Sequence, residues 1–171
     1  MQMNDFNRHS VHIHLSPSVN YSVGYRGEYW RRKEWQFHGT QINYLIKRFN
    51  TSKSQANFYL KSGAGFAVSD YKNHNNKIEP NVFTGISLDW EDRQYYISYQ
   101  NRVNHNSSID TFFLQKARIG FAPYIGKYGD LHTWVMLQVE NMSNTKNKII
   151  YTPMLRMFKG DYLAEAGLSN Y

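Results

Sequence analysis

Two closely spaced histidines are the first residues whose types and spacing could do chemistry. His12 and His14 lie two positions apart, so on a β-strand both side chains would point to one face and could share a transition-metal ion. A third ligand from His38, His132 or Glu165 would complete such a site. Because nothing in the sequence fixes that third ligand, we favour histidines that are hydrogen-bonded to their neighbours, and we predict no metal and no cofactor.

His14 could instead act as a catalytic base. Ser16 is two positions away, and Glu28 or Glu165 could orient the imidazole, which would give the Ser–His–carboxylate arrangement of an enzyme that modifies membrane lipids. On an alternating strand this serine would share the polar face, where an acyl chain has no direct access. We therefore keep a lipid-modifying enzyme as an alternative, favour a protein that is not an enzyme, and assign no catalytic residue.

The segment that carries these residues alternates strictly between apolar and polar side chains. From Val11 to Tyr25 the odd positions hold Val, Ile, Leu, Pro or Tyr, and the even positions hold His, Ser, Asn or Gly. This alternation predicts a β-strand with one apolar face, and it is longer than the ~5–6 residues of an average globular strand. The pattern recurs, and we predict nine strands at 11–25, 37–49, 55–69, 80–91, 94–104, 111–125, 130–142, 148–158 and 162–170.

Composition excludes several classes of protein. The 171 residues include no cysteine, which removes disulfides, thiolate nucleophiles and cysteine metal sites. No run of about 18 apolar residues exists, so no transmembrane helix is expected. The mean hydropathy of -0.67 is compatible with membrane strands, because their lipid-facing and interior-facing residues alternate. The net charge of +7 is scattered rather than gathered in a stripe, and we predict no nucleic-acid partner.

The strand pattern predicts an all-β fold, an antiparallel up-and-down transmembrane β-barrel. We expect a single domain over residues 1–171, in which residues 1–9 form a flexible N-terminal segment. Short links near 50–54, 92–93, 126–130 and 159–161 alternate with longer polar loops, as turns and loops do on the two sides of an outer membrane. Because single-chain bacterial barrels have even strand numbers, we expect ten strands in the complete protein, the tenth beyond Tyr171.

Charged residues gather on the polar positions of the predicted strands. In a barrel of this size the interior is only wide enough for side chains, so we expect these charges to pair with one another rather than line an open pore. The predicted charge network comprises Arg26, Glu28, Lys47, Lys61, Asp89, Glu91, Arg102, Lys116, Arg118, Glu140, Arg156 and Glu165.

Aromatic residues near the predicted strand ends suit the girdles that membrane barrels place at headgroup depth. The candidates are Tyr29, Trp30, Trp35, Phe37, Trp90, Tyr95, Tyr124, Tyr128, Trp134, Phe158 and Tyr162. Trp134 fits this role poorly because it falls on a polar position of its strand.

Three segments carry a resemblance to a known group of proteins. The stretches 25–30 (YRGEYW), 54–60 (SQANFYL) and 153–160 (PMLRMFKG), the last followed by Glu165-Ala166-Gly167, resemble an uncharacterised family of small proteobacterial outer-membrane proteins. The resemblance implies a β-barrel of a Gram-negative cell envelope and implies no chemistry.

These observations favour an integral outer-membrane β-barrel that serves as a structural or accessory protein or as a narrow channel. The alternative is a soluble lipocalin-like barrel that binds a hydrophobic ligand and turns its apolar positions inward. Expected partners are outer-membrane lipid and lipopolysaccharide, and another envelope protein at an open strand edge. The polar stretch Met1–Arg8 has no apolar signal-peptide core, so we expect the signal peptide to have been removed from this chain.

Overall fold

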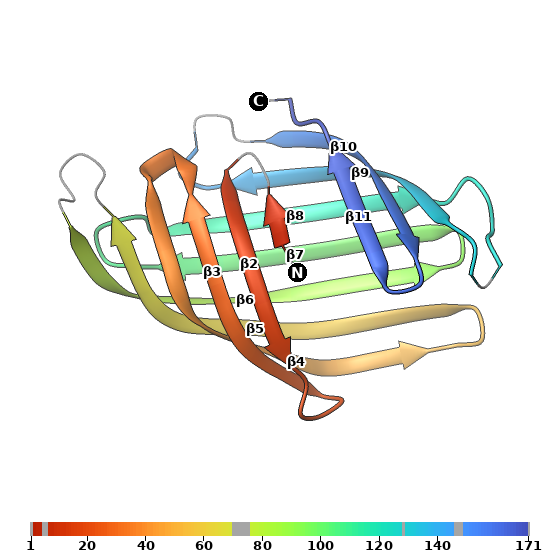
Figure 1. Cartoon of the computed structure of the whole chain (residues 1–171), viewed down its shortest axis with the longest axis horizontal. Coiled ribbons are helices and arrows are strands. Elements are labelled where there is room, and N and C mark those ends of the chain that lie inside the picture. The colour runs from red at the N-terminus through yellow and green to blue at the C-terminus, as the bar shows by residue number, and fades with distance from the viewer. Residues whose placement is uncertain (1, 5–6, 70–75, 128, 146–148, 171) are drawn as a thin grey trace. The chain divides into compact units, whose positions relative to one another are not determined.

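The computed structural model describes residues 2–4, 7–69, 76–127, 129–145 and 149–170. Within these residues it contains eleven β-strands, shown in chain order in Figure 1. The strands are β1 (Gln2–Asn4), β2 (Arg8–Leu15), β3 (Tyr21–Trp30), β4 (Trp35–Asn50), β5 (Ser54–Ser69), β6 (Lys77–Asp92), β7 (Tyr95–His105), β8 (Phe112–Phe121), β9 (His132–Met142), β10 (Ile150–Lys159) and β11 (Tyr162–Gly167). A 3-10 turn, η1 (Arg31–Lys33), joins β3 to β4. Among the described residues, no helix is long and apolar enough to cross a membrane.

Strand order in the sheet follows strand order in the chain. Each strand is hydrogen-bonded to the next from β1 to β11, and the pairings β2–β3, β3–β4, β8–β9 and β9–β10 are antiparallel. Period-two alternation produces the strands, and polar turns of a few residues favour pairing between sequence neighbours. The predicted all-β, antiparallel up-and-down fold is therefore confirmed.

The number of strands differs from the predicted nine. The predicted strand 11–25 is divided into β2 and β3 by a turn at residues 16–20. The apolar–polar alternation continues through this turn, because Pro17 and Val19 occupy the apolar positions. The chain nevertheless turns here, because proline cannot donate a hydrogen bond to a neighbouring strand and the adjacent Ser and Asn residues favour turns. The strand β1 is a second addition: it lies within residues 1–9, the segment expected to be flexible, and its Gln2 pairs with Val11 of β2.

One predicted short link is also wrong. The connection expected at 126–130 covers residues 122–131, because β8 ends at Phe121 rather than at residue 125. Ala122 leaves the ladder and its backbone N–H donates to Gln94 O, while Pro123 cannot donate at all.

The chain divides into two compact units. Unit 1 comprises residues 1–46, 59–86 and 102–113, and unit 2 comprises residues 47–58, 87–101 and 114–171. The long strands β4, β5 and β6 each contribute one part to each unit. The single domain over 1–171 stays a prediction.

On the strands of unit 1, one face buries polar and charged residues together with the rings of Trp30, Trp35, Phe37 and Phe83, and the other face exposes apolar residues. Arg26, Glu28 and Gln41 are buried, whereas Ile13 and Ile42 on the opposite face are 65% and 49% exposed. We call these two sides of each strand the polar face and the apolar face. In most water-soluble domains the charged residues lie outside and the large apolar residues lie inside.

Unit 2 has the same inverted distribution. Its polar face buries Lys116, Glu140 and Gln138. Its apolar face exposes many large side chains, among them Ile97, Ile119, Val135, Tyr151 and Leu155. A small apolar cluster lies on the polar face, where Trp134, Met136 and Ala122 are packed against Tyr96, Met154 and Phe158.

The aromatic residues expected in girdles fall into two groups. Trp30, Trp35 and Phe37 are buried, so the girdle prediction is wrong for them, because strand parity places Trp30 on the same face as Arg26 and Glu28. Trp134 is also buried, as its polar position indicates. The residues that are exposed and keep a girdle role as a prediction are Tyr29, Trp90, Tyr95, Tyr124 and Tyr162. Phe158 is partly buried, and Tyr128 lies outside the described residues.

Candidate functional site

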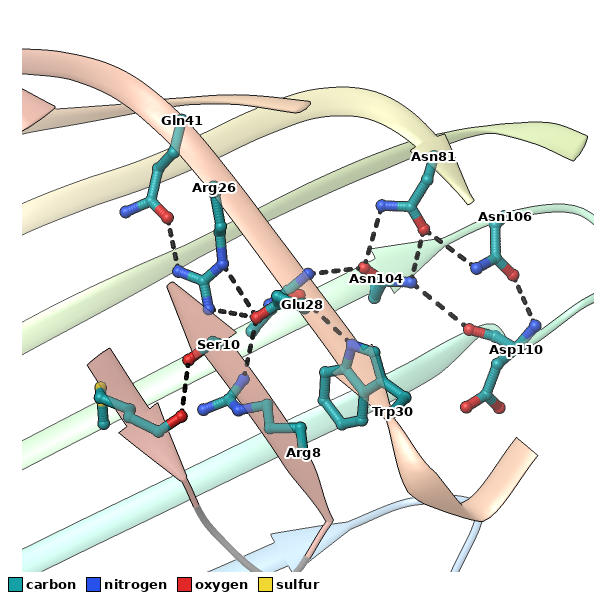
Figure 2. Close-up of polar contacts among 12 residues, drawn as sticks. Arg8, Ser10, Arg26, Glu28, Trp30, Gln41, Asn81, Asn104, Asn106 and Asp110 are labelled. Atoms are coloured by element: carbon teal, nitrogen blue, oxygen red, sulfur yellow. Dashed lines mark hydrogen bonds and ion pairs between the residues drawn. The ribbon is translucent and has the colours of Figure 1, made fainter. Parts of the chain in front are cut away.

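Glu28 is the centre of the polar face of unit 1 (Figure 2). Its Oε1 accepts hydrogen bonds from Arg102 Nη1 at 2.8 Å, from Arg26 Nε at 2.9 Å and from Arg8 Nη1 at 3.4 Å, and it also pairs with Arg26 Nη2. Its Oε2 accepts from Trp30 Nε1 at 3.3 Å. The carboxylate side chain is inaccessible to water. Such a carboxylate must be paired, because desolvating it alone costs several kcal/mol.

Alternation and register bring these side chains together. Arg26, Glu28 and Trp30 occupy alternate positions of β3 and therefore share one face. Antiparallel pairing sets Arg8 of β2 opposite Trp30 and Ser10 opposite Glu28. A slip of one residue in this register would turn every β2 side chain to the other face, so the β2–β3 register is part of the site.

Aromatic rings surround the guanidinium groups. Arg102 Cζ lies 3.9 Å from the centroid of the Phe83 ring, and Arg8 Cζ lies 5.1 Å from that of Trp30. The rings of Trp30 and Trp35 are stacked with their centroids 5.6 Å apart. All three rings are buried. A ring face attracts a cation most strongly where water is excluded, so these rings stabilise the buried positive charges.

A ladder of asparagine amides continues from Arg102. Arg102 Nη2 donates to Asn104 Oδ1 at 2.9 Å, and the amides of Asn104 and Asn81 exchange hydrogen bonds of 2.9 and 3.3 Å. Asn106 Nδ2 donates to Asn81 Oδ1 at 3.0 Å, and Asn106 Oδ1 accepts from the Asp110 backbone (Figure 2). These three asparagines are fully buried. Buried amides stabilise a fold only when they are bonded, so the ladder fixes β6, β7 and the following loop against one another.

Asp110 holds two connections of unit 1 together. Its Oδ1 lies 2.9 Å from Lys33 Nζ and 3.4 Å from Arg32 Nη2, and its Oδ2 accepts from Trp35 Nε1 at 3.3 Å. Lys33 Nζ also donates to the carbonyl of Ile109 at 3.1 Å. The turn η1 is therefore fixed to the loop between β7 and β8.

The polar face of unit 2 contains ion pairs of its own. Lys116 Nζ and Glu140 Oε2 are 2.9 Å apart. Glu165 joins two arginines, with its Oε1 2.6 Å from Arg156 Nε and its Oε2 3.4 Å from Arg118 Nη1. Because Arg156 is on β10 and Arg118 on β8, this one carboxylate connects β11 both with its direct neighbour β10 and with the non-adjacent strand β8.

Asp89 is joined to its surroundings through an amide. Asn57 Nδ2 donates to Asp89 Oδ1 at 2.7 Å, and Asn57 Oδ1 accepts from Arg48 Nε at the same distance. An amide group can accept a hydrogen bond from a guanidinium and donate one to a carboxylate at the same time. Asn57 therefore bridges the side chains of Arg48 and Asp89.

The predicted charge network is thus distributed over separate groups. Arg26, Glu28 and Arg102 meet in unit 1, and unit 2 brings together the pair Lys116–Glu140 and the triad Arg118, Arg156 and Glu165. Lys47 is exposed with its Nζ 5.6 Å from the Phe49 ring, and Lys61 Nζ lies 6.0 Å from the Tyr59 ring. Glu91 is half-buried on the polar face of β6.

Several residues of the site are missed by sequence reasoning. Arg8 lies in the segment assigned as flexible, and Asp110 lies in a loop, so strand parity gives no signal for either. Asn81, Asn104 and Trp30 do have the polar parity of their strands. Neutral amides and indole rings at the polar positions of the predicted strands, in addition to charged residues, are the signal that would identify them.

The histidines considered as metal ligands do not form a metal site. His12 and His14 share the polar face of β2, with ring centroids 5.9 Å apart. His38 is exposed on the apolar face, where its Nδ1 is hydrogen-bonded to Tyr25 Oη at 2.7 Å. In the part of the chain that the structure describes, no group of three or more His, Asp or Glu side chains is placed to hold a metal ion.

The candidate catalytic residues are not assembled either. Ser16 is exposed in the turn between β2 and β3. His14 pairs with Gly24 and Glu28 pairs with Ser10, so the carboxylate is four ladder positions from the imidazole, about 13 Å along the strand. Glu28 also has both its oxygens engaged by arginine and tryptophan donors. These three residues therefore cannot act as a triad in this arrangement.

The fold and the site define an all-β protein whose up-and-down antiparallel sheet buries an ionic face and exposes an apolar one. No family model, curated protein or solved structure matches the chain.

Proposed function

We propose that the protein is an integral β-barrel of a bacterial outer membrane, with a structural or accessory role. The observation that carries the proposal is the inverted burial, in which Glu28 and its arginines are buried while residues such as Ile13 and Ile119 are exposed. Hydrocarbon solvates an exposed apolar face at no cost, and an antiparallel ladder satisfies the backbone polar groups that lipid cannot.

Strand length supports the proposal. A strand tilted by about 45° needs about 9–11 residues to cross the hydrocarbon core. The strands β3, β7, β8, β9 and β10 have 10 or 11 residues, and β4, β5 and β6 have 16. In water, an apolar surface that extends over so many strands would be an aggregation site, because soluble monomers rarely expose patches above a few hundred Å².

The soluble lipocalin-like barrel is the less favoured reading. A lipocalin-like barrel would turn apolar side chains toward an interior ligand and polar ones toward water. The burial of Arg26, Glu28, Lys116 and Glu140 is the reverse of that arrangement. The lipid-modifying enzyme is also less favoured, because His14, Ser16 and Glu28 are separated.

The mutual pairing of the buried charges favours a structural role over a channel. A conducting interior needs charged groups that face water, whereas Glu28, Arg102, Lys116 and Glu140 are engaged with each other or with amides. Outer-membrane lipid and lipopolysaccharide are the proposed surroundings of the apolar face. The ends of the strand order, β1 and β11 among the described residues, are where another envelope protein would add a strand.

Refolding from urea tests the proposal. The denatured chain is diluted either into phosphatidylcholine vesicles or into buffer without lipid or detergent. We expect the protein to float with the vesicles, to resist alkaline extraction, and to migrate differently on a gel before and after heating. A folded, soluble monomer in the lipid-free sample would contradict the proposal.

A further inference from the structure

The apolar face of β2, β3 and β4 changes character along the strands. Antiparallel register places the outward residues of these strands in rows, which lie about 7 Å apart because each row is two residues from the next. From the η1 end, the rows are His9, Tyr29 and Gln36, then Val11, Gly27 and His38, then Ile13, Tyr25 and Thr40, then Leu15, Val23 and Ile42. The face therefore passes from polar and aromatic to aliphatic over about 20 Å.

Arg31 lies just beyond the polar row. It follows the last residue of β3, and it is exposed. Arg31 Nε donates to His9 Nε2 at 3.0 Å, and Arg31 Nη2 lies 2.7 Å from the same nitrogen. The His9 ring is stacked on Tyr29 with the centroids 6.3 Å apart. His9 thus fixes one edge of the guanidinium against the polar row.

The other basic residues of η1 share one carboxylate. Arg32 and Lys33 both pair with the carboxylate of Asp110. Arg31 differs from them, since the hydrogen bonds of its side chain within the described residues are those with His9 and include no carboxylate. A guanidinium has five N–H donors. His9 engages the Nε and Nη2 edge, so Nη1 and the second N–H of Nη2 stay available for an anion.

We propose that Arg31, positioned by His9 beside Tyr29, binds the phosphate of a membrane-lipid headgroup. This inference rests on the proposed membrane location. The row order supports a lipid over a free anion, because a lipid whose phosphate meets Arg31 can lay its chains along the aliphatic rows below. Two guanidinium N–H groups match two phosphate oxygens, and tyrosine favours the headgroup depth at which such a contact forms.

Native mass spectrometry of the full chain refolded in detergent tests the inference, because it resolves single lipid adducts. The probes are phosphatidic acid and diacylglycerol with the same acyl chains. We expect preferential binding of phosphatidic acid, and an apparent Kd about fivefold weaker for Arg31→Gln, the effect of one basic group at an anionic surface. The matched control is Arg93→Gln, an exposed arginine in the β6–β7 turn, which leaves the Kd unchanged.

Two further variants test the positioning role of His9. His9→Leu removes the acceptor and should weaken phosphatidic acid binding, while His9→Gln retains an acceptor and should restore it without changing diacylglycerol binding. Equal affinity of wild type and Arg31→Gln, or displacement of the lipid by inorganic phosphate, would overturn the inference. Because every variant is first shown to insert into vesicles, such a result leaves the membrane proposal standing, whereas failure to insert contradicts that proposal itself.

Discussion

Glu28 on β3 and Arg102 on β7 are 74 residues apart, and Arg102 Nη1 donates to Glu28 Oε1 at 2.8 Å. In the sheet these strands are separated by β4, β5 and β6. Their contact therefore holds the polar faces of non-adjacent strands of unit 1 against each other. A pair of this kind contributes tertiary structure that no single hairpin supplies.

Replacing Glu28 by glutamine should strongly destabilise the protein. The substitution keeps the shape of the side chain but leaves Arg26 and Arg102 buried without the carboxylate, and breaking a buried pair in this way costs about 3–5 kcal/mol. Urea unfolding in vesicles, followed by tryptophan fluorescence, measures the free energy of unfolding.

Glu34→Gln is the matched control for that substitution. Glu34 is exposed at the end of η1, so the same chemical change should alter the free energy of unfolding by less than about 0.5 kcal/mol. Equal effects of the two substitutions would mean that the Glu28 cluster contributes nothing specific.

Replacing Arg102 by lysine tests the geometry of the cluster separately from its charge. Arg102 donates to Glu28 and Asn104 from different nitrogens and covers the Phe83 ring, and one ammonium group cannot reproduce this fork. We expect a loss of about 1.5–3 kcal/mol, the value of a hydrogen bond to a charged group. Arg93→Lys in the exposed turn should have no measurable effect, and a loss at Arg102 no larger than at Arg93 would contradict the assigned geometry.

The alternation of side chains explains how much of the fold could be predicted. Strict alternation of apolar and polar residues predicts the strands β4 to β10 and also predicts which side chains lie on each of their two faces. It fails at Pro17, where the turn residues happen to keep the same parity, so β2 and β3 read as one strand. It also gives no signal for β1, which is three residues long.

The site could be predicted only in part, for a different reason. Parity identifies Arg26, Glu28 and Arg102 as residues of one face, but partners 74 residues apart cannot be matched from the sequence. Asp110 shows the limit most clearly, because a loop residue has no parity and its contacts with Lys33 and Trp35 depend on how two connections approach each other.

Gly65 should not tolerate alanine. A Cβ at this position would lie 2.2 Å from His38 O and 2.5 Å from Gly39 Cα, so backbone and not a flexible side chain would have to move. We expect Gly65→Ala to destabilise the protein by about 1–3 kcal/mol in the same unfolding assay. At Gly27 the nearest atoms belong to the Tyr25 ring, which can rotate away, so Gly27→Ala should cost less. The reverse order would contradict the close approach of Gly39 and Gly65.

A charge placed on the apolar face should be penalised as it is in lipid. Ile119 on β8 is 56% exposed, and its paired neighbours across β9 and β10, Leu137 and Pro153, are also apolar. If hydrocarbon covers this face, Ile119→Arg should cost about 2–4 kcal/mol, since arginine near the bilayer midplane is destabilising by that amount. Ser52→Arg in the exposed β4–β5 turn is the control, with an expected change below about 0.5 kcal/mol. Equal, small effects would indicate a face in water.

Quenching by brominated lipid tests the membrane location most directly. All four tryptophans are described, and Trp30, Trp35 and Trp134 are buried while Trp90 is 37% exposed on the apolar face of β6. In vesicles of phosphatidylcholine brominated on the acyl chains, the account predicts partial quenching that disappears in Trp90→Phe. Absence of quenching in the wild-type protein, or the same quenching in Trp90→Phe, would contradict it.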